Sequence, residues 1–274
     1  MKKEIQIDSV KIGGKNLPKI LGVLNISPES FFSDSFTPCS QAFRRAEELR
    51  RDGADILDLG ARSTALNAAP ISVQEEKERV VTSLKELDGC SLPLSLDTIH
   101  PEVLEAALHY DIALINDIGG LSNEKYARTV ADSGLPVIAM AADKVPGDPT
   151  NTATTHRALE LILTRKEKYG IENIILDPGI GKWVHERDSA ADWELCQRFE
   201  ELNRYGYPVL AAVSRKLFIG EELQKPAHDR LFGSLAVLAH LMEKGADLLR
   251  VHDVAATKDF ITVFARLHKE DYSL

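Results

Sequence analysis

The sequence has few of the features that mark secreted or membrane proteins. Only three of its 274 residues are cysteine, and Cys39, Cys90 and Cys196 are widely spaced. This fits neither a disulfide framework nor a zinc pattern, so we interpret the cysteines as structural. No apolar run approaches the roughly 18 residues of a membrane span. The N-terminal stretch MKKEIQID lacks the apolar segment of a signal peptide. We therefore expect a cytoplasmic protein that has no membrane partner.

Basic residues are also in the minority. The chain has 33 Lys and Arg against 42 Asp and Glu, which gives a formal net charge of −9. Nucleic acid requires a basic surface, so we expect no nucleic-acid partner. A local group of basic side chains can still bind a small anion. A hydrophobic fraction of 44% and 274 residues suit a globular barrel, and we expect one domain over residues 1–274.

Eight short apolar runs recur along the chain, each of a length that suits a strand buried on both faces. They span residues 19–25, 55–60, 92–97, 112–117, 135–140, 173–177, 207–214 and 247–252. Helical spacing is found in residues 40–53, 72–87, 101–110, 156–170, 192–206, 229–245 and 255–269. This α/β alternation predicts a (β/α)8 TIM barrel, with a doubly wound open sheet as the alternative. Residues 4–20 are expected to form a short N-terminal hairpin that plugs the bottom of the barrel.

Polar side chains stand at the ends of nearly all the predicted strands, where the active site of a barrel lies. They include Asn25, Asp97, Asn116, Asp177, Lys216, Arg250 and His252. The carboxylates and the amide suit a flat heterocycle with several N–H donors. The last three side chains are expected to supply positive charge for an anion. Asp58 lies inside its strand, and we interpret it as a buried structural carboxylate.

Seven segments resemble the signatures of the dihydropteroate synthase family, which belongs to the pterin-binding superfamily. In chain order they are ILGVLNISPESFFSD, GADILDLGARST, LSLDT, LINDIGGL, ILDPGIG, VSRKLFIG and RVHDV. The resemblance covers almost the whole chain. It implies a transferase that joins 6-hydroxymethyl-7,8-dihydropterin pyrophosphate to p-aminobenzoate with release of pyrophosphate. It also implies a homodimer formed through the last helices.

The same resemblance assigns roles to residues around the pterin. Asp97, Asn116 and Asp177 are expected to hold the pterin ring, and Lys216 is expected to contact its carbonyl side. Developing positive charge on the pterin would be stabilised by the two carboxylates. Asp97 and Lys216 are therefore also expected catalytic residues.

The pyrophosphate end has its own expected residues. Arg250 and His252 would grip the departing anion and count as catalytic. Asn25 would bind Mg2+ and pyrophosphate, which makes Mg2+ the expected cofactor. Thr64 would sit near the phosphates or the incoming amine.

Three segments depart from the family pattern, all near the expected aromatic amine. The family usually has GGEST followed by Arg-Pro-Gly, whereas this chain has Arg62 and Ala65 at two of those positions. After the fifth strand, MAADKVPGDP replaces the frequent Met-His. Lys182 and Trp183 replace a phenylalanine after the glycine turn.

We therefore place Arg62, Lys182 and Trp183 at a possible rim of the second-substrate site. Lys182 either binds an anion on a phosphorylated relative of p-aminobenzoate, or points to solvent while Trp183 takes the packing role. Two other functions stay open. One is a methyltetrahydrofolate-dependent methyltransferase of the same superfamily, and the other is a pterin-binding protein without synthase activity.

Overall fold

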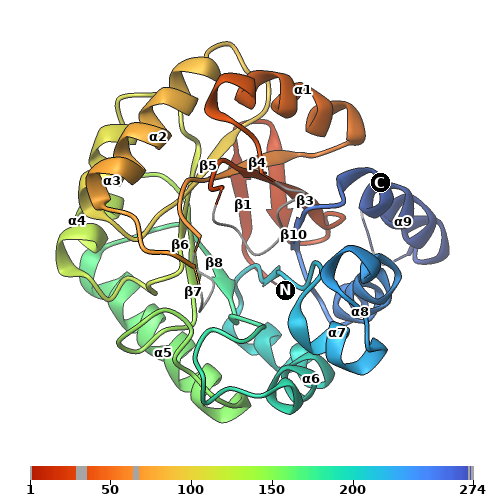
Figure 1. Cartoon of the computed structure of the whole chain (residues 1–274). Coiled ribbons are helices and arrows are strands. Elements are labelled where there is room, and N and C mark those ends of the chain that lie inside the picture. Colours follow the sequence, from red (N-terminus) through yellow and green to blue (C-terminus); the bar gives the residue numbers. More distant parts are fainter. Residues whose placement is uncertain (1, 29–35, 64–67, 271, 273–274) are drawn as a thin grey trace.

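A parallel eight-stranded sheet ringed by helices forms the centre of the computed structural model, which describes residues 2–28, 36–63, 68–270 and 272 (Figure 1). The strands of this sheet are β3 (Lys19–Asn25), β4 (Ile56–Gly60), β5 (Leu94–Asp97), β6 (Leu114–Asp117), β7 (Val137–Met140), β8 (Ile174–Asp177), β9 (Leu210–Ala211) and β10 (Leu248–Val251). Their order is β8-β7-β6-β5-β4-β3-β10-β9. A parallel bridge between Leu176 and Val209 joins the two edges. The sheet is thus a nearly closed barrel, which confirms the TIM-barrel prediction over the open sheet.

The N-terminal hairpin packs against the amino ends of the barrel strands. Its strands β1 (Glu4–Ile7) and β2 (Val10–Gly13) pair antiparallel. Ile5, Ile7 and Ile12 are buried in one apolar cluster with strand residues that include Leu21 and Ile175. The apolar plug keeps water out of the barrel at the end opposite the strand carboxyl ends. The predicted hairpin and its place are therefore confirmed.

Nine helices follow the strands in the described part of the chain. They are α1 (Ala42–Asp52), α2 (Val73–Glu86), α3 (Pro101–Ala107), α4 (Glu124–Ser133), α5 (Thr152–Tyr169), α6 (Ser189–Gln197), α7 (Leu217–Leu223), α8 (Leu231–Glu243) and α9 (Val254–Leu267). Short 3-10 segments cover Cys39–Gln41, Phe199–Tyr205 and Ala227–Asp229. No helix in the described ranges is long and apolar enough to cross a bilayer.

The periodicity of the sequence missed two of these helices and overextended another. α4 buries only Tyr126, Ala127 and Val130, so its apolar stripe is short. Asn123 caps its start and Gly134 ends it in a left-handed conformation. Both residue types are sequence signals for the ends of a helix. α7 has seven residues and no side-chain cap at its start, whereas the equally short α3 begins with a proline that marks it. The helix predicted over residues 192–206 splits, because its second half is the 3-10 segment Phe199–Tyr205.

Candidate active site

The strand register fixes the spacing of the polar residues at the carboxyl end of the barrel. Asp97 at the end of β5 pairs with Asn116 of β6, and Asp58 of β4 pairs with Ser95 of β5. Neighbouring strands lie about 4.8 Å apart, so these side chains meet without any help from loops. The structure brings together six of the expected strand-end residues, and it places Asn25 at the end of β3. Thr64 lies outside the described residues.

Asp58 is the centre of a buried hydrogen-bond network. Its side chain is fully buried and accepts from Ser95 Oγ at 2.7 Å, from Asn116 Nδ2 at 3.1 Å and from Arg250 Nε at 2.6 Å. A buried carboxylate needs such partners, because desolvation of an unpaired charge costs several kcal/mol. Asp58 therefore orients two expected ligand-binding residues, Asn116 and Arg250, rather than serving the fold alone.

Arg250 joins Asp58 to Asp97 across the barrel. Its Nη2 donates to Asp97 Oδ2 at 2.7 Å. Burial raises the pKa of Asp97, the positive charge of Arg250 opposes that shift, and the negative charge of Asp58 adds to it. Burial alone would lower the pKa of Arg250, but the two carboxylates outweigh burial and raise this pKa. Arg250 is thus a permanent cation that limits the rise in the pKa of Asp97, which still reaches about 7 because burial is the larger effect.

Asn116 presents an unsatisfied acceptor. Its Nδ2 is engaged by Asp58, which fixes the orientation of the amide. Its Oδ1 is buried and has no hydrogen-bond partner among the described residues. A buried amide oxygen without a partner costs about 1–3 kcal/mol. A ligand N–H that reaches this oxygen would remove that cost.

Asp177 and Lys216 form the opposite side of the site. Asp177 accepts from the backbone N–H of Gly179 at 2.8 Å, and its pKa is raised by burial although Gly179 and Lys216 oppose this. Burial lowers the pKa of Lys216 to about 8, and Asp177 partly offsets the shift. Gly181 has φ +120°, and a Cβ there would lie 2.9 Å from Lys216 Nζ. Glycine is therefore required at position 181 by both its conformation and the lysine beside it.

The ammonium group of Lys216 also rests on an aromatic ring. Lys216 Nζ lies 4.7 Å from the centroid of Trp183, within the range of a cation–π contact. Trp183 packs closely against Gly147, where any Cβ would collide with the indole side chain. Trp183 is therefore fixed between the loop after β7 and the lysine that follows β9.

The surroundings of His252 favour its neutral form, whereas the sequence predicts a positive charge there. Its Nδ1 lies 3.1 Å from Ser214 Oγ. Burial lowers the pKa of His252 to about 3, with a further decrease from Arg250. Arg215 lowers this pKa as well, and Asp253, which pairs with Arg215 at 2.6 Å, partly offsets the shift. His252 can therefore contribute a neutral ring N–H, whereas the cationic charge comes from Arg250 and Lys216.

Asn25, the expected metal ligand, is the last residue of β3. Its Oδ1 accepts from the backbone N–H of Ser27 at 3.0 Å, and carbonyl oxygens are among the ligand types that suit Mg2+. In the described residues, no group of three or more His, Cys, Asp or Glu side chains could hold a metal ion. Mg2+ commonly takes one or two protein ligands and completes its shell with water and substrate phosphates. Asn25 thus fits a metal that binds together with a pyrophosphate.

Comparison with known proteins agrees with this geometry. Residues 21–252 match the pterin binding enzyme family. The dihydropteroate synthase of Haemophilus influenzae is 35% identical over 261 residues, which cover 91% of this chain and 94% of that protein. The chain belongs to the dihydropteroate synthase family. The relatives carry the name of a transferase, so the expected enzyme class is confirmed.

Solved structures of dihydropteroate synthases share the whole barrel. The Xanthomonas albilineans enzyme with 4-aminobenzoic acid aligns with a TM-score of 0.86 and 33% identity, over 98% of this chain and 99% of that one. The Coxiella burnetii enzyme in complex with pteroic acid aligns with a TM-score of 0.84 and 28% identity, over 98% of each chain. These relatives are synthases, so nothing in the comparison favours the methyltransferase alternative.

Arg62, which departs from the dihydropteroate synthase pattern, is tied to the helix that follows it. Its Nε donates to Glu76 Oε2 at 2.6 Å. Glu76 is almost fully buried in α2 and also accepts from Thr98 Oγ1 at 2.6 Å, while His100 Nδ1 lies 2.9 Å from it. The structure therefore assigns Arg62 a buried carboxylate partner. A contact with the second substrate remains a prediction for this residue.

Lys182 and Trp183 differ in their surroundings. Lys182 is exposed, and it makes no hydrogen bond or ion pair with the residues that the structure describes. Trp183 is half-buried and packs on Gly147 and Lys216. Of the two interpretations of this segment, the geometry agrees with the one in which Trp183 packs and Lys182 faces solvent.

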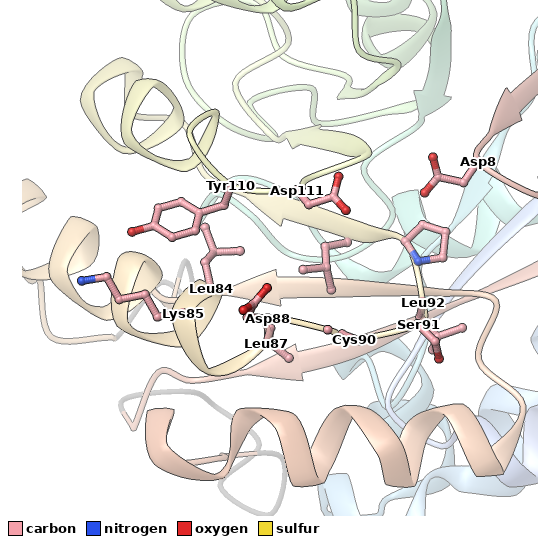
Figure 2. Close-up of a pocket in the computed structure, with 13 residues that line it drawn as sticks. Asp8, Leu84, Lys85, Leu87, Asp88, Cys90, Ser91, Leu92, Tyr110 and Asp111 are labelled. Carbon is pink, nitrogen blue, oxygen red and sulfur yellow. The ribbon is translucent and has the colours of Figure 1, made fainter.

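A separate hollow lies at the other end of the barrel. It has a volume of about 690 Å³ and is lined by residues of the hairpin turn, the end of α2 and the connections into β5 and β6 (Figure 2). Asp8, Asp88 and Asp111 are among the labelled side chains (Figure 2). In barrel enzymes this end contributes to stability and the opposite end to catalysis. We therefore assign the chemistry to the ring around Asp97, Asn116 and Asp177, despite the size of this hollow.

Proposed function

We propose that the ring at the carboxyl end of the barrel binds 6-hydroxymethyl-7,8-dihydropterin pyrophosphate and transfers its pterin methylene group to p-aminobenzoate. The observation that carries this proposal is the buried Oδ1 of Asn116, which has no hydrogen-bond partner in the part of the chain that the structure describes. Asn116 pairs with Asp97 across the strands, and Asp58 fixes the orientation of its amide. A pterin has amino and ring N–H groups on one edge, and these are the donors that such an acceptor requires. The pteroic acid bound by the Coxiella burnetii relative contains a pterin of this kind.

The proposed roles on the pterin side follow from charge. Breaking the bond between the methylene carbon and the pyrophosphate oxygen leaves positive charge that spreads into the pterin ring. Asp97 and Asp177 stabilise that charge from positions where solvent is largely excluded. Lys216 donates to the pterin carbonyl, and the Trp183 ring stabilises its ammonium group through a cation–π contact. The amine nitrogen of p-aminobenzoate then attacks the exposed carbon and loses one proton to solvent, and no covalent bond to the protein is needed.

The leaving group requires a different set of residues. Arg250 has further N–H groups beyond the two that bind Asp58 and Asp97, and these would contact the pyrophosphate. His252 would add a neutral N–H donor. Asn25 would hold Mg2+, which supplies charge neutralisation for the pyrophosphate when it is bound.

The amine that we propose is p-aminobenzoate rather than a phosphorylated relative. The Xanthomonas albilineans relative was solved with 4-aminobenzoic acid. In this chain Lys182 is exposed and Arg62 is already paired with Glu76, so neither offers a prepared phosphate site. A phosphorylated amine remains the second candidate because Lys182 is a flexible cation near the loop that carries Trp183.

We also propose a cytoplasmic homodimer. The three cysteines are free thiols, as expected in a reducing compartment. Phe232 on α8 is 81% exposed, and Val263 and Leu267 on α9 are 62% and 77% exposed. Large exposed apolar side chains on neighbouring helices suit an interface with a second copy. Sedimentation of the wild type and of Phe232→Glu tests this proposal.

Pyrophosphate release with and without p-aminobenzoate tests the reaction. A synthase releases pyrophosphate and forms dihydropteroate when both substrates are present, and Asn116→Leu should abolish pterin binding. Asp247→Asn is a matched control, because Asp247 pairs with Lys2 at 2.6 Å at the opposite end of the barrel. Pterin binding without any turnover would support the pterin-binding protein without synthase activity instead.

A further inference from the structure

A buried ion pair connects the loops that follow β7 and β8. The side chains of Arg187 and Asp192 are 1% and 2% exposed. Arg187 Nε donates to Asp192 Oδ1 at 2.8 Å, and its Nη1 donates to the carbonyl oxygen of Pro149 at 2.9 Å. Asp192 Oδ1 also accepts from the backbone N–H of Gly181 at 2.8 Å. One pair thus holds the backbone of both loops.

The burial of this pair calls for an explanation beyond stability. Placing an arginine and an aspartate in a dry interior costs several kcal/mol per ion, and well-packed apolar residues often stabilise such a site equally well. What the pair supplies instead is geometry, because the planar guanidinium binds two acceptors in fixed directions. Asp192 lies in the first turn of α6, so both loops are anchored to a rigid helix.

The two loops carry the parts that surround Lys216. Gly181, whose N–H is held by Asp192, lies directly against the lysine Nζ. Trp183 stands two residues further on and supports the same ammonium group at 4.7 Å. Gly147, on the loop held through Pro149, also packs against Trp183. A shift of either loop would therefore move the support of Lys216.

We propose that the buried Arg187–Asp192 ion pair is a positioning device that locks the loops after β7 and β8 together and so places Trp183 against Lys216 at the pterin site. This inference rests on the proposed function in one respect, since it takes Lys216 to be a pterin-binding group. Neither Arg187 nor Asp192 is itself a catalytic residue.

The electrostatics of the pair give the proposal a distinctive readout. Besides burial and the charges of Asp177 and Arg250, Asp192 raises the pKa of Lys216 and Arg187 lowers it. In the wild type these two contributions oppose each other. Asp192→Asn leaves the charge of Arg187 without its partner, so the pKa of Lys216 should fall below the wild-type value of about 8. Pterin binding should then weaken at a lower pH than in the wild type.

Asp192→Asn is the main test, because asparagine has nearly the same shape but lacks the negative charge, so it binds Arg187 more weakly. The chain has two tryptophans, so a Trp193→Phe background reports Trp183 alone by fluorescence. In that background, Asp192→Asn should shift the Trp183 emission, weaken binding of 6-hydroxymethylpterin about tenfold or more, and move the alkaline loss of binding to lower pH. Arg187→Lys keeps the charge but cannot span both acceptors. It should weaken binding without moving the pH dependence.

Asp247→Asn is again the matched control. Asp247 is a buried aspartate that pairs with Lys2 and accepts from the Val209 N–H at 2.8 Å, but it lies far from the site. It should lower the melting temperature and leave pterin binding, Trp183 emission and the pH dependence unchanged. If Asp192→Asn and Arg187→Lys behave like this control, the pair is only structural and the proposal fails. Because fluorescence and binding do not require turnover, this result does not depend on whether the wild type makes dihydropteroate.

Discussion

Replacement of Asp58 by asparagine should damage pterin binding although Asp58 itself faces the protein. Three donors converge on this carboxylate, from Ser95, Asn116 and Arg250. An amide has one acceptor oxygen, so its NH2 group must face at least one of those donors. Asn116 can relieve the conflict by rotating its amide, which turns its Oδ1 toward position 58 and away from the ligand.

The magnitude follows from the number of hydrogen bonds affected. Loss of one buried acceptor for the pterin costs about 1–3 kcal/mol, which corresponds to roughly 5- to 150-fold weaker binding. The free energy of unfolding should also fall by about 2–4 kcal/mol, since the Arg250 charge loses one of its two partners. Calorimetry with 6-hydroxymethylpterin measures the first effect, and urea unfolding measures the second.

Ser95→Ala is the control for this experiment. It removes one donor to Asp58 at 2.7 Å but leaves the charge of Asp58 and the orientation of Asn116 intact. We expect at most about 1.5 kcal/mol of lost stability and wild-type affinity for the pterin. Equal affinities in Asp58→Asn, Ser95→Ala and the wild type would show that Asp58 does not orient Asn116, and the reasoning about the free acceptor would be wrong.

Three further predictions concern the remaining groups of the site. Lys216 has a pKa lowered to about 8, so its charged form is present below that pH and is lost above it. Calorimetric pterin affinity should decline as the pH rises through that value, and Lys216→Met should bind weakly without such a decline. His252 has a pKa lowered to about 3, so it should be neutral. The affinity for the pyrophosphate ester should therefore show no histidine titration between about pH 5 and 8. A transition in affinity with a midpoint near pH 6.5 that disappears in His252→Gln would contradict this. Lys182→Ala should leave the KM for p-aminobenzoate within about twofold of the wild type, because a wet lysine contributes little. Trp183→Ala should raise that KM about tenfold through loss of aromatic packing. If Lys182→Ala and Trp183→Ala raise the KM equally, Lys182 belongs to the amine site.

The barrel was predictable because its strands are continuous apolar segments, as buried parallel strands generally are. The run at residues 19–25 coincides with β3 (Lys19–Asn25), and each of the other seven predicted runs contains an observed strand. The register of the strands then places the residues at their ends. Asp97 and Asn116 had to be neighbours once the strands were consecutive, and they are.

The contacts between side chains were not predictable in the same way. The sequence shows Asp58 only as a carboxylate inside an apolar strand. Its role depends on Arg250, which is 192 positions away. The neutral state of His252 depends on burial beside Arg250, and the pairing of Arg62 depends on a glutamate in the next helix. Such interactions follow from three-dimensional proximity, for which spacing along the chain gives no signal.

The proposed site has two parts, one formed by strand ends and the other by loops. The proposed pterin half stands on strand ends, where backbone hydrogen bonds between β4, β5 and β6 set the positions of Asp58, Asp97 and Asn116. The proposed amine half stands on loops, which tolerate substitutions more readily than a barrel core does. Trp183 and Lys182 can therefore differ from the family pattern while the pterin residues match it. In this chain the buried pair of Arg187 and Asp192 binds the backbone of that loop at Gly181, so a change in the pair should be felt at Trp183.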